Sequence, residues 1–291
     1  MKHLLPLLIA GGLLVWVFLD IENESKTSSS KNVLCSQCEL DKANRFTLDI
    51  VNVSPFEFEK IDGVWWMKSP IFDMASPSRI YELEKYLRSS TIIEKIEKPQ
   101  EGQFSGVLAR IGWNGTWSLK IGGEFAMDGN LFAQTSEGNA YVIDGMWNDV
   151  FLTDPLAWID DFVFANLVDR INGIRLRWAG NQFSLQKQDS QWFLKPQVPA
   201  ELSQVKKYLL GMSDFRARNL RQGDISEKSS VFMEVTLASG QSIQFRGQVV
   251  GKEVYIHRSD RNVIFVVDLA EFEKMMWQED YFKISEGEAG P

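Results

Sequence analysis

The sequence repeats itself at a shift of about 125 residues, and this repeat restricts the possible folds more than any other feature. Residues 56–60 read Phe-Glu-Phe-Glu-Lys and residues 183–187 read Phe-Ser-Leu-Gln-Lys; each leads through a turn to a tryptophan, Trp65 and Trp192 respectively. Further matches follow in the same order along the chain: Lys85-Tyr86-Leu87 with Lys207-Tyr208-Leu209, Gly115 with Gly240, Gly122 with Gly247, and Asp144 with Asp268. Such self-similarity is typical of two copies of one structural unit, so the sequence predicts two tandem modules.

Local patterns indicate the architecture of each module. Residues 46–50 and 174–178 alternate apolar and polar side chains, as half-buried strands do. Ser76-Pro77 is typical of a helix start, and Asn114-Gly115 is a strong hairpin signal. Strands that pair with their sequence neighbours around one packing helix form an antiparallel α+β sheet.

We therefore expect the α+β fold class, with an N-terminal transmembrane helix and two tandem copies of an antiparallel-sheet module, each with a packing helix. The expected divisions are a transmembrane anchor at 1–21, a flexible tether at 22–44, repeat one at 45–152, a connecting helix at 153–172, repeat two at 173–285 and a tail at 286–291.

The N-terminal segment is the basis for the anchor. Residues 4–19 are uncharged and almost wholly apolar, and as a helix they would extend about 24 Å, close to the ~30 Å of a bilayer core once the flanks are added. Lys2 precedes them, whereas Asp20 and Glu22 follow, which places the N-terminus in the cytoplasm and the body outside. A cleaved signal peptide is the alternative, although no small-x-small cleavage site follows the apolar run.

The only two cysteines, Cys35 and Cys38, lie in the expected tether with two residues between them. Glu39 follows, so the pair is not a haem attachment site, and a zinc site would need further ligands. The cysteines of a redox centre normally lie at the start of a helix that follows a strand, whereas Cys35 and Cys38 lie in the expected tether. We favour a local disulfide in an oxidising compartment; a metal or a disulfide shared with a partner is the alternative.

Composition and motif searches indicate a protein without catalytic residues, cofactor or metal. The formal net charge of −8 argues against binding to nucleic acid. The chain has two histidines, no Gly-x-Ser-x-Gly motif and no phosphate-binding loop. Asp154 and Asp160-Asp161 are the least ordinary carboxylates for a hydrolase, but acidic residues beside a helix start are usually caps.

Two tryptophans give the sharpest candidate site. Trp113 and Trp117 flank the Asn114-Gly115 turn and do not recur in the second copy, where Ala238 and Ser242 take their places. Because they flank this turn, we expect them near a hairpin tip, and because the fold does not require them in both copies, we expect them either to contact a partner or to pack on a neighbouring loop.

The order of features resembles a known family. The N-terminal anchor, the segment 65–70 (Trp-Trp-Met-Lys-Ser-Pro), the helix after it and the duplicated glycine hairpins are similar to an uncharacterised bacterial envelope domain family, a domain of unknown function encoded beside gliding-motility-type ABC exporter genes. The resemblance covers about residues 45–285. It implies an extracytoplasmic accessory protein and supplies no catalytic residues; Cys35 and Cys38 are not features of it.

The expected function is therefore that of a non-enzymatic scaffold or accessory subunit of an integral membrane protein complex. It would be anchored in the bacterial inner membrane by residues 4–19, with a periplasmic body. Two alternatives from other classes stay open: a module that binds glycan or envelope polymer through Trp113 and Trp117, and a carboxylate-dependent hydrolase.

Overall fold

The structure is a computed structural model of the 291-residue chain. It describes residues 33–35, 42–100, 104, 107–115, 117–125, 129–145, 147, 150–195, 197–225 and 229–284. The expected anchor at 4–19 and the tail at 286–291 lie outside these residues. Within them, no helix has the length and apolar character needed to cross a membrane.

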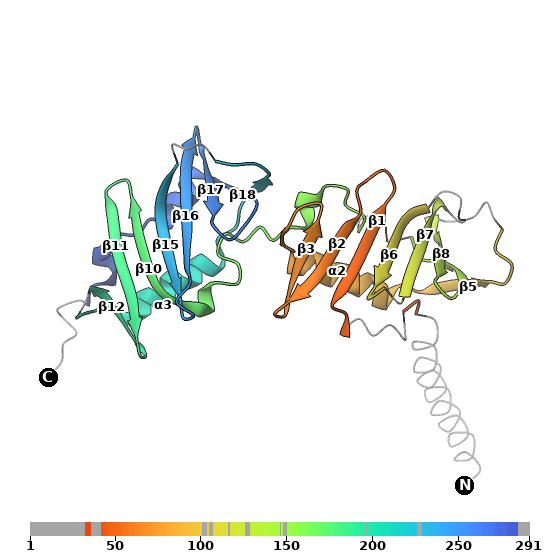
Figure 1. Ribbon diagram of the computed structural model, residues 1–291, viewed down its shortest axis with the longest axis horizontal. Coiled ribbons are helices and arrows are strands. Elements are labelled where there is room, and N and C mark those ends of the chain that lie inside the picture. Colours follow the sequence, from red (N-terminus) through yellow and green to blue (C-terminus); the bar gives the residue numbers. More distant parts are fainter. Residues whose placement is uncertain are drawn as a thin grey trace, which may run out of the picture. The chain divides into compact units, whose positions relative to one another are not determined.

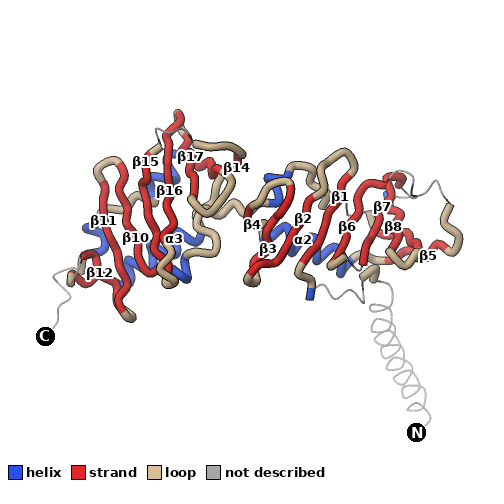
Figure 2. The backbone as a smooth tube through the Cα atoms, in the orientation of Figure 1, coloured by secondary structure: helices blue, strands red, loops and turns tan. Residues whose placement is uncertain are grey.

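The chain divides into two compact units, one formed by Met1–Pro70 with Pro77–Asp154 and the other by Ile71–Ser76 with Pro155–Pro291. Two large antiparallel sheets and a few short helices make up the described residues (Figures 1 and 2). The architecture is thus mixed but mostly β, and the expected antiparallel sheets are present.

The first sheet has the strand order β4-β3-β2-β1-β6-β7-β8-β9-β5. Its strands are β1 (Arg45–Ile50), β2 (Phe56–Ile61), β3 (Val64–Ser69), β4 (Asp73–Met74), β5 (Ile92–Ile96), β6 (Val107–Trp113), β7 (Trp117–Phe125), β8 (Leu131–Thr135) and β9 (Ala140–Ile143). Helix α2 (Pro77–Ser89) packs on one face and buries Ile80, Leu83 and Leu87 (Figure 1).

The second sheet has the order β13-β12-β11-β10-β15-β16-β17-β18-β14. Its strands are β10 (Ile171–Trp178), β11 (Asn181–Gln188), β12 (Gln191–Lys195), β13 (Val198–Pro199), β14 (Asn219–Arg221), β15 (Ser230–Leu237), β16 (Ser242–Val250), β17 (Glu253–Arg258) and β18 (Ile264–Asp268). The helices are α3 (Leu202–Ser213), α4 (Leu269–Lys274) and the short 3-10 helix η7 (Glu279–Phe282).

The two sheets have the same strand order, counted from the first strand of each. The residues that carry the sequence repeat lie on corresponding elements. Trp65 is on β3 and Trp192 on β12, and Gly115 and Gly240 occupy the turns after β6 and β15, where both have positive φ. Glycine adopts that backbone conformation without steric cost, which accounts for its place in both hairpins.

Each sheet has one buried and one open face. In β11, Phe183 and Leu185 are buried, whereas the alternating Ser184 and Gln186 are exposed. Side chains along a strand point to opposite faces, so this alternation places the apolar residues in the core beneath α3 and the polar residues in solvent.

The predicted connecting helix at 153–172 is wrong. This segment contains two short 3-10 helices, η5 (Pro155–Trp158) and η6 (Val168–Arg170), and β10 begins at Ile171. Between them the chain forms isolated antiparallel bridges, Ala75 with Ile159 and Phe162 with Arg216. Backbone groups that pair with other segments in this way are not available for the hydrogen bonds of a helix.

Part of the expected tether is packed against the first unit. Val33 forms an antiparallel bridge with Thr91, and the Leu34 amide donates to the Ser90 carbonyl at 3.0 Å. Leu34 and Cys35 are buried. The prediction of a flexible tether over 22–44 is therefore wrong for residues 33–35.

Candidate functional site

Helix α3 has two apolar faces. Val205, Tyr208 and Met212 are buried in the core of the second unit. A second face is formed at the spacing i, i+7 and i+8 by Leu202, Leu209 and Leu210, and Lys206 lies on the same face at i+4. Leu202 and Leu210 are 47% and 64% exposed. An amphipathic helix needs only one apolar face for its own packing, so the second face is in excess of what the fold requires.

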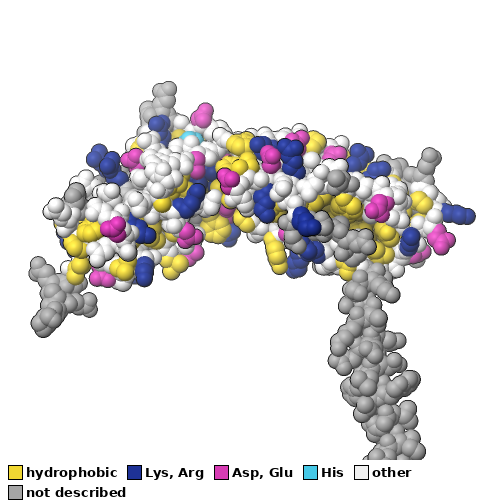
Figure 3. Space-filling view, turned by 60° about the horizontal axis from the view of Figure 1, so that its bottom comes forward, with side chains coloured by type: hydrophobic (Ala, Val, Ile, Leu, Met, Phe, Trp, Pro, Cys, Tyr) yellow, Lys and Arg dark blue, Asp and Glu magenta, His cyan; other side chains and the backbone are white. Residues whose placement is uncertain are grey.

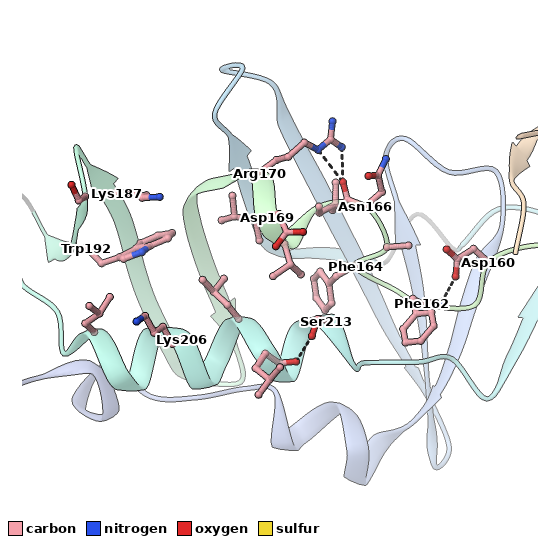
Figure 4. A pocket seen from close by; sticks show the side chains of 18 residues that line it. Asp160, Phe162, Phe164, Asn166, Asp169, Arg170, Lys187, Trp192, Lys206 and Ser213 are labelled. Atoms are coloured by element: carbon pink, nitrogen blue, oxygen red, sulfur yellow. Dashed lines mark hydrogen bonds between the residues drawn. The ribbon is translucent and has the colours of Figure 1, made fainter. Parts of the chain in front are cut away.

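This second face forms one wall of a groove of about 880 Å³. Residues 160–171 form the opposite wall, and side chains from β11 and β12 close one end (Figure 4). Phe164 fixes the opposite wall because its ring packs on Phe215 and Phe245, at centroid distances of 6.0 and 4.9 Å. The volume lies within the range of about 300–1,000 Å³ that is usual for ligand sites.

One end of the groove is basic. Lys187 and Lys206 lie on either side of the Trp192 ring (Figure 4). Lys187 is half-buried and Lys206 is exposed. Among the described residues neither lysine forms an ion pair or a ring contact. Their two positive charges are thus not compensated within the site.

The corresponding pair in the first unit is arranged differently. Lys60 lies opposite Trp65 in the β2–β3 ladder, as Lys187 lies opposite Trp192 in the β11–β12 ladder. The Lys60 ammonium lies over the Trp65 ring, 5.7 Å from its centroid. The Lys60 ammonium is thus held by a cation–π contact with Trp65. Within the described part of the chain, the Lys187 ammonium has no such contact and is available to bind a ligand.

The other end of the groove holds Asp160. Asp160 is 5% exposed and accepts a hydrogen bond from the Phe162 amide at 3.1 Å. Burial raises the pKa of Asp160 above its ordinary value, although Arg261 and Arg258 nearby oppose this shift. Arg170 also lines the groove, and its guanidinium donates two hydrogen bonds to the Asn166 carbonyl.

A buried network supports the wall formed by residues 160–171. Arg258 donates to the carbonyls of Val163 and Ala165, both at 3.0 Å, and its other nitrogens bind Asp260. Arg261 donates to the Asp160 carbonyl at 2.9 Å. Charged hydrogen bonds of this kind are strong and directional, so they hold a wall that has little regular secondary structure.

The helix of the first unit repeats the second face of α3 only in part. At the shift of 122 residues that aligns Lys85 with Lys207, Leu202 and Leu209 correspond to Ile80 and Leu87, which are buried in the first unit. Leu210, in contrast, corresponds to the charged Arg88. The exposed leucine in the last turn of α3 is therefore not needed for an antiparallel sheet with this strand order.

The tryptophans that the sequence singled out lie in the first unit. Trp113 is 4% exposed and stacks on Phe46 with ring centroids 5.1 Å apart. The expected exposure at a hairpin tip is wrong for Trp113, because the Asn114 side chain accepts hydrogen bonds from the amides of Asn44 and Arg45 and ties the turn to β1. Trp117 is half-buried, and its contact with a partner stays a prediction.

The other candidates have mainly structural surroundings. Cys35 is disulfide-bonded; Cys38, its expected partner and the only other cysteine, lies outside the described residues. Asp161 pairs with Arg216 at 3.2 Å, and Asp154 is exposed. Asp160 is thus the one of these three carboxylates that reaches the groove.

Sequence reasoning missed Lys187, Lys206 and Leu210. The spacing of Leu202, Lys206 and Leu210 was a readable signal, because these residues recur every fourth position on one helix face. Their proximity to Lys187 was not readable, since it depends on how α3 packs beside β11.

Comparison with known proteins assigns the chain to a family. Residues 81–232, about half of the chain, match a family described as a domain of unknown function (DUF4340). The chain belongs to this family. No curated protein and no solved structure matches it. The matched residues include α3 and all the groove residues named above.

Proposed function

We propose that this DUF4340 protein is a non-enzymatic accessory subunit of an integral membrane protein complex of the ABC-exporter type. Its residues 4–19 would anchor it in the bacterial inner membrane, with both units in the periplasm. The groove beside α3 would bind the partner protein.

The observation that carries this proposal is the second apolar face of α3. Leu202 and Leu210 are exposed on the rim of the groove, and the corresponding helix of the first unit has the charged Arg88 in the place of Leu210. Apolar side chains reach the surface in patches between charged ones (Figure 3). A partner that covers these leucines would remove apolar surface from water, worth about 25 cal/mol for each Å² buried.

The proposal can be tested by co-purification in mild detergent from the natural host. We expect an integral membrane protein to co-purify with the wild-type chain and to be lost with Leu210→Glu, because the glutamate would place a charge in an apolar contact. Val250→Glu is the matched control: Val250 is 42% exposed on β16 and lies outside the groove.

Thermal unfolding of both variants separates binding from folding. Equal melting of Leu210→Glu and Val250→Glu, with loss of the partner only in the first, supports the proposal. Retention of the partner by Leu210→Glu at the wild-type level would show that the groove is not the contact surface.

A further inference from the structure

The geometry points to the chemical class of the occupant: we propose that the groove binds an extended, aliphatic segment of the partner protein that carries a carboxylate between Lys187 and Lys206. This inference rests on the proposed function and deepens it, because it names which kind of segment the α3 face recognises.

The carboxylate is inferred from charge. Lys187 and Lys206 approach the same end of the groove from β11 and α3, and neither is ion-paired within the described part of the chain. The chain as a whole carries a formal charge of −8, so two uncompensated cations beside Trp192 form a local positive site on an acidic protein. Complementary charge at such a site gives specificity and speeds association.

The aliphatic part is inferred from the lining between the two ends. Leu209 and Leu210 from α3 line the groove, as do Leu167 and Val168 from the wall formed by residues 160–171. These side chains offer no hydrogen-bonding group to a ligand. An occupant must therefore present apolar side chains along this stretch.

The extended form and the length follow from α3. Its 12 residues extend about 18 Å, and an extended chain rises about 3.3 Å for each residue. The groove therefore holds about five extended residues, one of them acidic and the others largely aliphatic.

A protein segment fits better than an anionic lipid because the end of the groove opposite the two lysines holds the carboxyl group of Asp160. The tail of an anionic amphiphile with its head between Lys187 and Lys206 would run past Asp169 and end beside Asp160. A hydrocarbon tail would displace water from the carboxylate without offering it a hydrogen bond, which costs free energy. A peptide instead presents backbone N–H groups along its length, and these can donate to carboxylates.

The test measures fluorescence anisotropy of a labelled peptide of alternating leucine and glutamate with the purified full-length chain. Leucine–glutamine and leucine–lysine peptides serve as probes of charge. We expect the glutamate peptide to bind about tenfold more tightly than the glutamine peptide, and the Lys187→Glu, Lys206→Glu double variant to lose this preference. The double variant should instead prefer the leucine–lysine peptide.

Lys252→Glu is the matched control, since Lys252 is exposed in the turn between β16 and β17, away from the groove. Its affinity for the glutamate peptide should equal that of the wild type. Equal binding of the glutamate and glutamine peptides by the wild type would overturn the inference. So would displacement of the peptide by an anionic lysophospholipid that the double variant no longer binds, because the groove would then be a lipid site.

Co-purification separates this inference from the proposed function. Loss of the partner with Leu210→Glu but not with the lysine double variant would support the proposed function and reject the inference of an acidic segment. Retention of the partner by both variants would reject both the proposed function and this inference.

Discussion

The Asp73 carboxylate and the Arg261 guanidinium form an ion pair in which both side chains are fully shielded from solvent. Asp73 also accepts a hydrogen bond from the Asn262 amide at 2.8 Å. Both residues belong to the second unit, where the segment Ile71–Ser76 packs with residues after Asp154. The pair therefore attaches a segment that is remote in sequence to the turn between β17 and β18.

Removal of one partner from this pair should destabilise the second unit strongly. Asp73→Ala would leave the buried Arg261 charge without its counter-ion, which typically costs about 3–5 kcal/mol of unfolding free energy. Urea denaturation measures this change. Asp161→Ala is the control, because Asp161 pairs with Arg216 at a partly exposed site, where a pair contributes about 1 kcal/mol or less. Equal effects of the two substitutions would contradict the account.

The pH dependence of stability should identify Asp160 as a buried, disfavoured charge. Burial raises its pKa in the folded state above 3.8, so the folded protein binds this proton more tightly than the unfolded chain. The contribution of Asp160 to the free energy of unfolding is therefore fully present below pH 3.8, and it is lost as the pH rises through the pKa of the folded state. Asp160→Asn should stabilise the protein at pH 7 and make no difference near pH 3.

Asp260→Asn provides a control of opposite sign. Burial acts to raise the pKa of Asp260, but the hydrogen bonds and positive charge of Arg258, together with the charge of Arg261, more than offset it and the net shift is downward. Asp260→Asn should therefore destabilise the protein at pH 7, and this loss should diminish as the wild-type carboxylate is protonated at low pH. Denaturation curves of both variants at pH 7 and near pH 3 measure these changes. Stabilisation of the protein by Asp260→Asn at pH 7 would refute this explanation.

The packing of residues 33–35 predicts a role for Leu34 in stability. Leu34→Ala should lower the unfolding free energy of the first unit by about 2–3 kcal/mol, because Leu34 is buried and its removal leaves a cavity. Val51→Ala, at a half-exposed valine of the same unit, should change it by less than about 1 kcal/mol. Unchanged thermal melting of Leu34→Ala would indicate that these residues are a free tether after all.

Trp113 should behave as a core residue. Trp113→Ala should cost about 3–5 kcal/mol, because it removes a buried ring that stacks on Phe46. Trp117→Ala should cost less, since Trp117 is half-buried. Chemical denaturation of the two variants measures the difference. An unchanged midpoint for Trp113→Ala would favour the exposed-tip interpretation.

The sheets were predictable because strand alternation is a local property: apolar and polar residues exchange faces at every step along 46–50 and 174–178. The segment 153–172 was not predictable in the same way. Its backbone hydrogen bonds connect distant residues, such as the Ser76 amide and the Trp158 carbonyl at 2.8 Å. Such pairings leave no periodic pattern in the sequence.

The site was predictable only in part, for the same reason. The outer face of α3 could be predicted from residues that recur at every fourth position. The proximity of Lys187 to Lys206 could not, because it arises from packing between a strand and a helix. Trp113 is buried although it does not recur in the second copy. A residue that differs between copies can still be buried when a single polar side chain, here Asn114, ties its turn to another strand.

Site-specific photo-cross-linking tests the central claim most directly. A photoreactive amino acid in place of Leu210, in full-length protein made in its own host, should form a cross-link to an integral membrane protein. The cross-link should disappear when Lys187→Glu and Lys206→Glu are added, and the same probe at Val250 should give none. A cross-link at position 250 without one at position 210, or a product at 210 that contains only lipid, would contradict the account.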